Sequence, residues 1–232
     1  RPMRDTCTLS IDVVPVTASV STSNHQSVPG VVPKETTPPT ALATSGGRRV
    51  LGLVGPPGAG KSTVSTALQR VLGAAMVVVG MDGFHLANAE LIRLDRRQRK
   101  GAPDTFDVDG YVRLLTRLRS QSGPLYAPRF DRELEESIGS AVLVEPATAL
   151  VVTEGNYLLH DELGWDEVRP QLDEVWYLHL NDAERRRRLV QRRLDHGDTV
   201  EHAAHWVEHV DEPNAVLVAA TRHRADAVVV LD

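Results

Sequence analysis

Cysteine, long apolar stretches and excess positive charge are all scarce in this chain of 232 residues. Cys7 is the one cysteine, which excludes an internal disulfide framework and fits a reducing compartment. No apolar run approaches the about 18 residues that a membrane-spanning helix needs. The formal net charge is −5, whereas nucleic-acid-binding proteins typically carry an excess of positive charge. We therefore expect a cytoplasmic protein without a membrane or nucleic-acid partner.

Regular patterning is missing from residues 1–47, which are rich in Ser, Thr, Val and Pro and carry few charges. Such a stretch cannot bury enough apolar surface to offset the entropy of ordering it. We predict a disordered tail over 1–47 and one folded domain over 48–232. Asp12 and Pro15 interrupt the only apolar run of the tail, so we expect no secretory signal. The chain opens on Arg1 rather than Met, which leaves a missing start open.

Three glycines occur in one turn, "GPPGAGKST", directly after the apolar run 50–54. The Walker A pattern G-x-x-x-x-G-K-[ST] is complete in this turn. Backbone N–H groups of such a loop, together with the helix N-terminus that follows, cradle phosphate groups. Lys61 would reach the β- and γ-phosphates, and the Ser62 hydroxyl would hold Mg²⁺. The predicted nucleoside triphosphate site consists of Gly55, Pro56, Pro57, Gly58, Ala59, Gly60, Lys61, Ser62 and Thr63.

Strand-like and helix-like segments alternate beyond residue 48, which is typical of a parallel sheet with crossover helices. The predicted strands are 49–54, 76–81, 149–154, 174–180 and 226–231, all apolar on both faces. The predicted helices are 61–72, 87–99, 109–121, 182–195, 200–209 and 213–222. The first βα turn lacks the G-x-G-x-x-G spacing of a Rossmann fold. We predict an α/β P-loop NTPase fold, with a doubly wound parallel sheet of about five strands and flanking helices.

Two acidic residues, Asp82 and Glu154, stand at the ends of predicted strands. Ligands of open α/β sheets bind outside the carboxyl ends of the strands, so both carboxylates belong beside the phosphate loop. Either could join the Mg²⁺ shell or accept a proton from a substrate hydroxyl, and we assign Glu154 to the metal. The alternatives are that Asp82 is only a turn residue before Gly83 and that Glu154 is a strand end facing solvent.

An arginine-rich helix is predicted over "DAERRRRLVQRRLD". At 100° per residue, Arg185, Arg188 and Arg192 share one face, and the apolar residues lie roughly opposite. Such a helix suits a lid that closes over a triphosphate. One alternative is a solvated face paired with Glu184 and Asp195. The other is RNA binding, which the lack of interleaved aromatic residues disfavours.

Three histidines, His202, His205 and His209, follow on the next predicted helix. Their spacing could place them on one face for a metal ion. No cysteine joins them, and we interpret them as the wet side of an amphipathic helix rather than a zinc site.

Seven motifs occur in a characteristic order: "GPPGAGKST", "MDGFH", "APDTFDVDGY", "LYAPRFDRELEES", "TEGNYLL", "RLVQRR" and "PNAVLVAATRHRADAVVV". In this combination, over about residues 48–232, the chain resembles the P-loop kinases that include uridine kinase, phosphoribulokinase and bacterial pantothenate kinase. It is most similar to unassigned bacterial members, some named fructose-transport-system kinases. The resemblance implies transfer of the ATP γ-phosphate, with Mg²⁺, to a hydroxyl of a small metabolite such as a nucleoside, a sugar or a pantothenate-like compound.

The same resemblance implies roles for single residues. Asp82 would be the general base, Lys61 would serve the phosphates, and Arg188 and Arg192 would be lid arginines. The implied acceptor site consists of Asp82, His85, Asp107, Tyr126, Arg129 and Arg132. Uridine kinases carry a "DSFY"-like turn and a later Tyr-Asp pair, whereas this chain has "DGFH" and "YA", so the identity of the acceptor stays open. The "DGF" form is nearer to pantothenate kinase.

Two other functions share a phosphate loop. A regulatory NTPase would hydrolyse ATP without an organic acceptor, and a nonenzymatic module would only bind the nucleotide. The chain lacks the Asn-Lys-x-Asp motif of guanine-specific switches and the Leu-Ser-Gly-Gly signature of transport ATPases. We therefore expect a kinase whose partner is a small-molecule hydroxyl acceptor, and a homodimer is left open.

Overall fold

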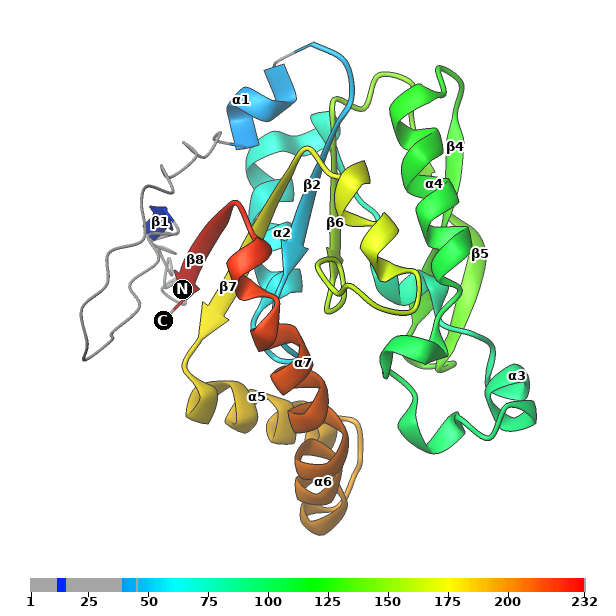
Figure 1. Ribbon diagram of the computed structural model, residues 1–232, viewed down its shortest axis with the longest axis vertical. Coiled ribbons are helices and arrows are strands. Elements are labelled where there is room, and N and C mark those ends of the chain that lie inside the picture. Colours follow the sequence, from blue (N-terminus) through cyan, green and yellow to red (C-terminus); the bar gives the residue numbers. More distant parts are fainter. Residues whose placement is uncertain (1–11, 16–38, 45, 232) are drawn as a thin grey trace, which may run out of the picture.

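The computed structural model describes residues 12–15, 39–44 and 46–231. A six-stranded sheet with the order β1-β8-β7-β2-β6-β3 forms its centre (Figure 1). The strands are β1 (Asp12–Pro15), β2 (Arg49–Val54), β3 (Met76–Val78), β6 (Leu150–Gly155), β7 (Glu174–Leu180) and β8 (Ala227–Leu231). Five of them pair in parallel, and β1 adds antiparallel to β8. The predicted parallel sheet of about five strands is confirmed.

Helices connect the strands as the alternating pattern predicted. They are α1 (Pro39–Thr44), α2 (Lys61–Leu72), α3 (Asn88–Arg93), α4 (Val108–Ser120), α5 (Asp182–Asp195), α6 (Val200–Trp206) and α7 (Glu212–Ala220). The predicted helix 87–99 is shorter than expected, because Asp95 takes a left-handed backbone with φ 55°. A π-helical turn, Val207–Asp211, joins α6 to α7, so the helices predicted at 200–209 and 213–222 are continuous.

A hairpin of β4 (Leu125–Asp131) and β5 (Glu136–Val144) stands beside α4 and was not predicted as strands (Figure 1). Its register shifts between Ala127 and Arg129, which places a bulge at Pro128. A proline cannot donate to the ladder, and strands accommodate it at such bulges. Because of the proline, the sequence pattern does not predict β4, although the strand forms in the tertiary structure.

Alternating side chains of β2 enter two separate cores on the two faces of the sheet. Val50 and Val54 belong to the cluster that includes Leu115 of α4. Leu51 and Leu53 belong to the other cluster, which includes residues of α2. Burial on both faces explains why the strand is a continuous apolar run. The resulting three layers hold the carboxyl ends of the parallel strands rigidly at one edge, where the site lies.

Two segments of the predicted tail have regular structure. Strand β1 pairs with β8, and α1 places Leu42, which is 7% exposed, in the core on the α2 side of the sheet. The structure differs from the prediction here because a free strand edge and an apolar surface supply partners that composition does not reveal. Residues 1–11, 16–38 and 45 of the predicted tail lie outside the described residues, and their disorder stays a prediction.

Among the helices of the described segments, none has both the length and the apolar character needed to cross a membrane.

Candidate active site

The phosphate loop runs from the end of β2 at Val54 to the start of α2 at Lys61. Gly58 and Gly60 take left-handed backbone conformations with φ of 79° and 90°. The Ala59 amide donates to the Pro56 carbonyl at 3.1 Å and closes the turn. Left-handed residues of this kind let a loop turn its N–H groups toward one anion. The glycines of the motif are therefore required by the backbone itself.

Lys61 lies within this loop and donates only to neutral oxygens. Its ammonium contacts the carbonyls of Gly55 at 2.7 Å and Pro56 at 3.1 Å, and the side-chain oxygen of Asn156 at 2.7 Å. Desolvation lowers the pKa of Lys61 to about 8, although the nearby carboxylate of Glu154 opposes this shift. An ammonium without a contacting anion is ready to bind phosphate oxygens.

Glu154, at the end of β6, joins the neighbouring strand to the phosphate loop. Its two carboxylate oxygens accept hydrogen bonds from Ser62 at 3.0 Å and from Ser65 at 3.2 Å. Burial raises the pKa of Glu154, while Lys61 and the two hydroxyls act in the opposite direction. Mg²⁺ prefers such oxygen ligands beside substrate phosphates. The hydroxyl of Ser62 and the carboxylate of Glu154 therefore fit the metal site assigned to them.

Asp82 lies in the short 3₁₀ turn Met81–Phe84 that follows β3. Its carboxylate is 44% exposed and pairs with the Arg132 guanidinium at 3.4 Å. Its carbonyl contacts the Nδ1 atom of His85 at 2.8 Å. A Cβ atom on Gly83 would lie 2.6 Å from the Pro128 carbonyl, so the turn needs glycine to pack against the hairpin. Asp82 is thus held at the edge of a rigid turn with its carboxylate still accessible.

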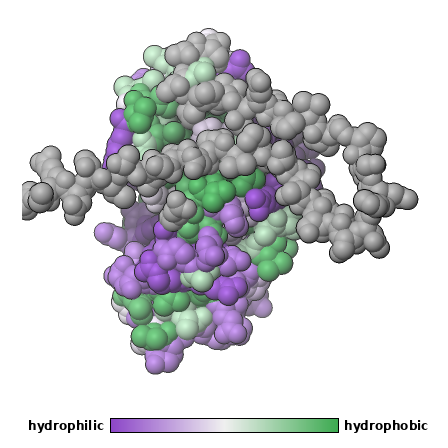
Figure 2. Space-filling model, turned by 90° about the vertical axis from the view of Figure 1, so that its left-hand side faces the viewer, coloured by the Kyte–Doolittle hydropathy of each residue, from purple (hydrophilic) through white to green (hydrophobic). Residues whose placement is uncertain are grey.

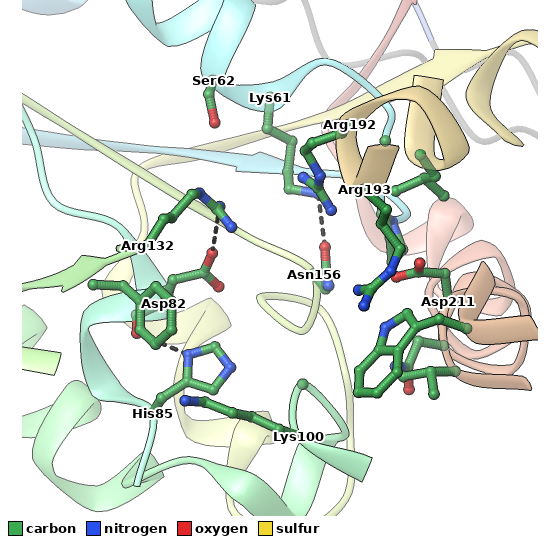
Figure 3. A pocket seen from close by; sticks show the side chains of 18 of the residues that line it. Lys61, Ser62, Asp82, His85, Lys100, Arg132, Asn156, Arg192, Arg193 and Asp211 are labelled. Carbon is green, nitrogen blue, oxygen red and sulfur yellow. Dashed lines mark hydrogen bonds and ion pairs between the residues drawn. The ribbon is translucent and has the colours of Figure 1, made fainter. Parts of the chain in front are cut away.

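Helix α5 forms the wall that faces this turn. Arg188 pairs with Glu184 at 2.6 Å and lines the pocket. Arg192 lines the same pocket, and Figure 3 shows its guanidinium beside Lys61. The surrounding protein atoms lower the pKa of Arg192, and repulsion from Arg132 adds to this effect. Cations held this close together favour an anionic ligand between them.

Arg185 has a different position from the other two arginines, although all three were predicted to share a face. It is 1% exposed and donates to the Pro57 carbonyl at 3.3 Å and to Glu212 at 2.5 Å. A Cβ atom on Gly58 would meet Leu189 at 2.8 Å and the Arg185 side chain at 3.1 Å, so α5 packs directly on the phosphate loop. This packing buries the first arginine, which links the loop to α7.

The outer face of α5 is exposed to solvent, as in the alternative interpretation of the arginine-rich helix. Arg186 and Arg187 are exposed and pair with Glu212 and Glu184. Figure 2 shows mostly hydrophilic side chains over the lower part of the molecule, where Figure 1 places α5 and α6. The arginine run therefore divides into a buried anchor, pocket residues and surface residues.

One pocket of about 900 Å³ is lined by Lys61, Ser62, Asp82, Glu154, Arg188 and Arg192. The phosphate loop, the turn after β3, the end of β6, the hairpin and helices α5 to α7 all contribute to its lining. In Figure 3, Asp82 with Arg132 lies across the cavity from the pair Arg193 and Asp211, and Lys61 lies between these two groups. Ligand pockets commonly have volumes of about 300–1,000 Å³, and this one lies near the upper limit.

Three residues of the predicted acceptor site do not line this pocket. Asp107 caps α4 by accepting from the Gly110 amide at 2.9 Å. Tyr126 is 56% exposed, because it lies on the face of β4 opposite the buried Leu125. Arg129 is also exposed. The structure places these three side chains outside the pocket, and their role in binding the acceptor stays a prediction.

The bulge brings another residue of β4 to the pocket in place of Arg129. Phe130 lines the cavity, and Arg132 and His85 lie there as predicted. Gly55, Pro56 and Ala59 are buried in the loop, and the other predicted loop residues line the pocket.

Several pocket residues were not singled out from the sequence: Lys100, Asn156, Phe130, Arg193, Trp206, Asp211 and Asn214. Phe130, Asn156, Arg193 and Asn214 lie inside quoted motifs, so the motifs contained a signal for them. Asp211 and Trp206 reach the pocket through the π-helical turn and the end of α6, and turns of this kind are frequent at functional sites.

The histidines of the lid region lie on α6 and the π turn. His202 contacts Asp198 at 3.0 Å, and the rings of His205 and His209 stack 4.1 Å apart. The stretches that the structure describes contain no group of three metal-ligating side chains with metal-site geometry.

Replacing Asp211 with asparagine is expected to alter the pH dependence of stability. Burial raises the pKa of Asp211 to about 6, against the opposing fields of Arg192, Arg193 and Arg185 and with a contribution from Glu212. The native state therefore binds this proton more tightly than the unfolded chain. The stability that the proton contributes is present below pH 4 and is lost as the pH rises through 6.

Unfolding free energies should therefore show the Asp211 protein losing on the order of 1 kcal/mol, relative to Asp211→Asn, between pH 5 and pH 8. Asp109→Asn, which removes an exposed carboxylate paired with Arg113, is the control and should give no such difference. Parallel pH profiles for the native chain and Asp211→Asn would contradict the expectation.

No protein-family model matches the chain. The chain is 32% identical over 196 residues, 78% of its length and 83% of the relative, to a Schizosaccharomyces pombe protein named "putative uridine kinase". It is 34% identical over 188 residues to the uncharacterized protein YggC of Escherichia coli, covering 78% of this chain and 77% of the relative.

The chain is also similar to a solved structure with a kinase name. The crystal structure of a "putative fructose transport system kinase" from Silicibacter sp. TM1040 is similar, with a TM-score of 0.74 and 39% identity. The similarity covers 80% of this chain and 90% of that structure.

Proposed function

Because the chain belongs to the family of P-loop kinases that includes uridine kinase, pantothenate kinase and phosphoribulokinase, we propose that it transfers the ATP γ-phosphate to a hydroxyl of a small molecule. The family predicted from the motifs is confirmed, and membership makes the chain a kinase and a phosphotransferase. The acceptor hydroxyl and the roles of single residues belong to the proposal.

The position of Asp82 is the main observation that supports this proposal. Its accessible carboxylate shares one pocket with the phosphate loop, at the edge of the sheet where Lys61 and Ser62 lie. A binding module or a simple phosphate clamp has no use for a carboxylate there, because it would repel the γ-phosphate. A kinase uses such a group to accept the proton of the attacking hydroxyl.

In the proposed reaction each of these groups has one role. The acceptor oxygen forms a bond to the γ-phosphorus while the bond from that phosphorus to the bridging oxygen breaks, and ADP leaves. The hydroxyl proton passes to Asp82. Lys61 holds the phosphate oxygens from the loop side, and Arg188 and Arg192 neutralise charge from the lid side.

Mg²⁺ fits between the loop and β6, where Ser62 and Glu154 would hold it. When bound, the ion supplies charge neutralisation on the β- and γ-phosphates. Ser65 orients the Glu154 carboxylate through its hydrogen bond of 3.2 Å. The same bond fixes β6 against α2, so the metal ligands keep their position without the nucleotide.

The test is to incubate the protein with Mg²⁺ and ATP labelled at the γ-phosphate, together with a pool of small metabolites. We expect label on an organic acceptor. Label appearing only as inorganic phosphate would favour a regulatory NTPase and contradict the proposal. Retention of all label on ATP, with nucleotide binding confirmed separately, would leave a nonenzymatic module and would also contradict it.

A further inference from the structure

Lys100 is a buried cation on the acceptor side of the pocket. Its side chain is 6% exposed, and the residue lines the cavity. The ammonium donates to the Asn88 side-chain oxygen at 2.8 Å and to the Glu135 carbonyl, and it lies 4.8 Å from the Phe130 ring. The Glu135 carboxylate is 4.0 Å away, beyond hydrogen-bond range. Mainly neutral dipoles and a ring face therefore compensate this charge.

A purely structural role for Lys100 would be costly. Burying an ammonium whose nearest carboxylate is 4.0 Å away carries a desolvation penalty, and burial lowers the pKa of Lys100 although Glu135 and Glu136 oppose this shift. An apolar side chain of the same length would fill this volume at less cost. The cation is therefore better explained by a ligand that enters the pocket.

Arg97 adds a second cation to the same wall. It lines the pocket, and no hydrogen bond or ion pair of its side chain occurs within the described part of the chain. Its charge repels that of Lys100 and contributes to the lowered pKa of the lysine. Glu133 and Glu135 also line this side. Two neighbouring cations, one unpaired and one buried, are the arrangement that an anion would stabilise.

His85 lies between Asp82 and Lys100. Its Nδ1 atom contacts the Asp82 carbonyl, which can only accept, so Nδ1 carries the hydrogen. Burial lowers the pKa of His85, which favours the neutral form of the ring, although the charge of Asp82 opposes this shift. Figure 3 shows the second ring nitrogen turned toward the cavity, with the Lys100 side chain below the ring. This nitrogen is therefore a hydrogen-bond acceptor for a hydroxyl group.

We propose that Lys100 and Arg97 bind an anionic oxygen group of the acceptor, a carboxylate or a phosphate, while His85 accepts a hydrogen bond from a hydroxyl beside the one that reacts. The acceptor is then a small polyhydroxy anion, either a hydroxy acid or a sugar phosphate. The inference deepens the proposed function and depends on it for the identity of the reacting hydroxyl.

Equilibrium binding tests this without turnover. The protein is loaded with Mg²⁺ and a non-hydrolysable ATP analogue, and calorimetry compares pairs that differ in charge: glycerate with glycerol, gluconate with glucose, and ribose 5-phosphate with ribose. We expect the anionic member of at least one pair to bind at least tenfold more tightly. The carboxylate and phosphate pairs distinguish the two sources of negative charge.

Two variants address Lys100 directly. Lys100→Met removes the charge and keeps the stem, and Asn88→Asp keeps the lysine but gives it a contacting carboxylate within a nearly unchanged shape. Both should abolish the preference for the anion. Arg70→Met removes a cation from the exposed end of α2 and should retain the preference.

Equal binding of the members of every pair, or no binding of any anionic probe, would overturn the inference. So would a preference that survives in Asn88→Asp, which is the deciding variant if Lys100→Met does not fold. Anion binding without any transfer of label from ATP would instead contradict the proposed function alone.

Discussion

Asp82→Asn is expected to lower the rate of phosphoryl transfer by ~10²- to 10⁴-fold, the range for a positioned general base. The amide keeps the size of the side chain and the contact with Arg132, but it cannot receive the hydroxyl proton. The carboxylate is 44% exposed, and its ion pair with Arg132 is 3.4 Å long. Removing the negative charge should therefore change the free energy of unfolding little. The measurement is kcat and KM with the acceptor found in the labelling experiment, and binding of ATP with Mg²⁺ in parallel.

The matched control is Asp109→Asn, because Asp109 pairs with Arg113 on the exposed surface of α4. It should leave kcat unchanged. A rate for Asp82→Asn within about threefold of the parent, far below the effect of a general base, would make Asp82 a turn residue. Loss of Mg²⁺-dependent ATP binding together with the rate would place Asp82 in the metal shell beside Glu154.

Lys61→Met is expected to weaken ATP binding and to reduce transfer at least a hundredfold, which is the lower range for removing one positioned donor from a transition state. The methionine fills much of the same volume but cannot bridge the β- and γ-phosphates. Arg70→Met, at the exposed end of the same helix, is the control for the loss of one positive charge. Unchanged ATP affinity in Lys61→Met would contradict the phosphate-cradle interpretation.

The pH dependence of ATP binding provides a second readout for Lys61. Desolvation lowers its pKa to about 8, and bound phosphates would raise the pKa again by stabilising the ammonium. ATP binding at pH 8 should therefore be accompanied by proton uptake. The affinity should decrease as the pH rises above 8, by up to tenfold per pH unit.

Calorimetry in buffers with different ionisation enthalpies measures this proton uptake directly. Lys61→Met should remove the Lys61 component. The same uptake in both proteins would show that another group is titrating.

Local patterns in the sequence predicted the strand, turn and helix of the phosphate loop, because this geometry is local. The left-handed conformations of Gly58 and Gly60 and the continuous apolar run of β2 depend on neighbouring residues and on burial of a strand on both faces. The parallel sheet follows from the same alternation of segments. Asp82 and Glu154 could also be placed beside the loop, because parallel strands end at one edge.

Tertiary packing decided which residues complete the pocket. Asn156 contacts Lys61 across 95 positions in the chain, and Arg132 contacts Asp82 across 50. Sequence spacing alone carries no information about such distances. The bulge at Pro128 determines which side chains of β4 reach the cavity, and periodicity does not locate a bulge.

Helix α5 shows most clearly which features follow from the local sequence and which follow from tertiary packing. Its sequence by itself determined that a helix forms over these residues. Only the packing of α5 on Gly58 decided that Arg185 is a buried anchor while Arg188 and Arg192 line the pocket. The physical reason is that helical periodicity fixes the angle between side chains, whereas burial and contact depend on the elements that pack against the helix.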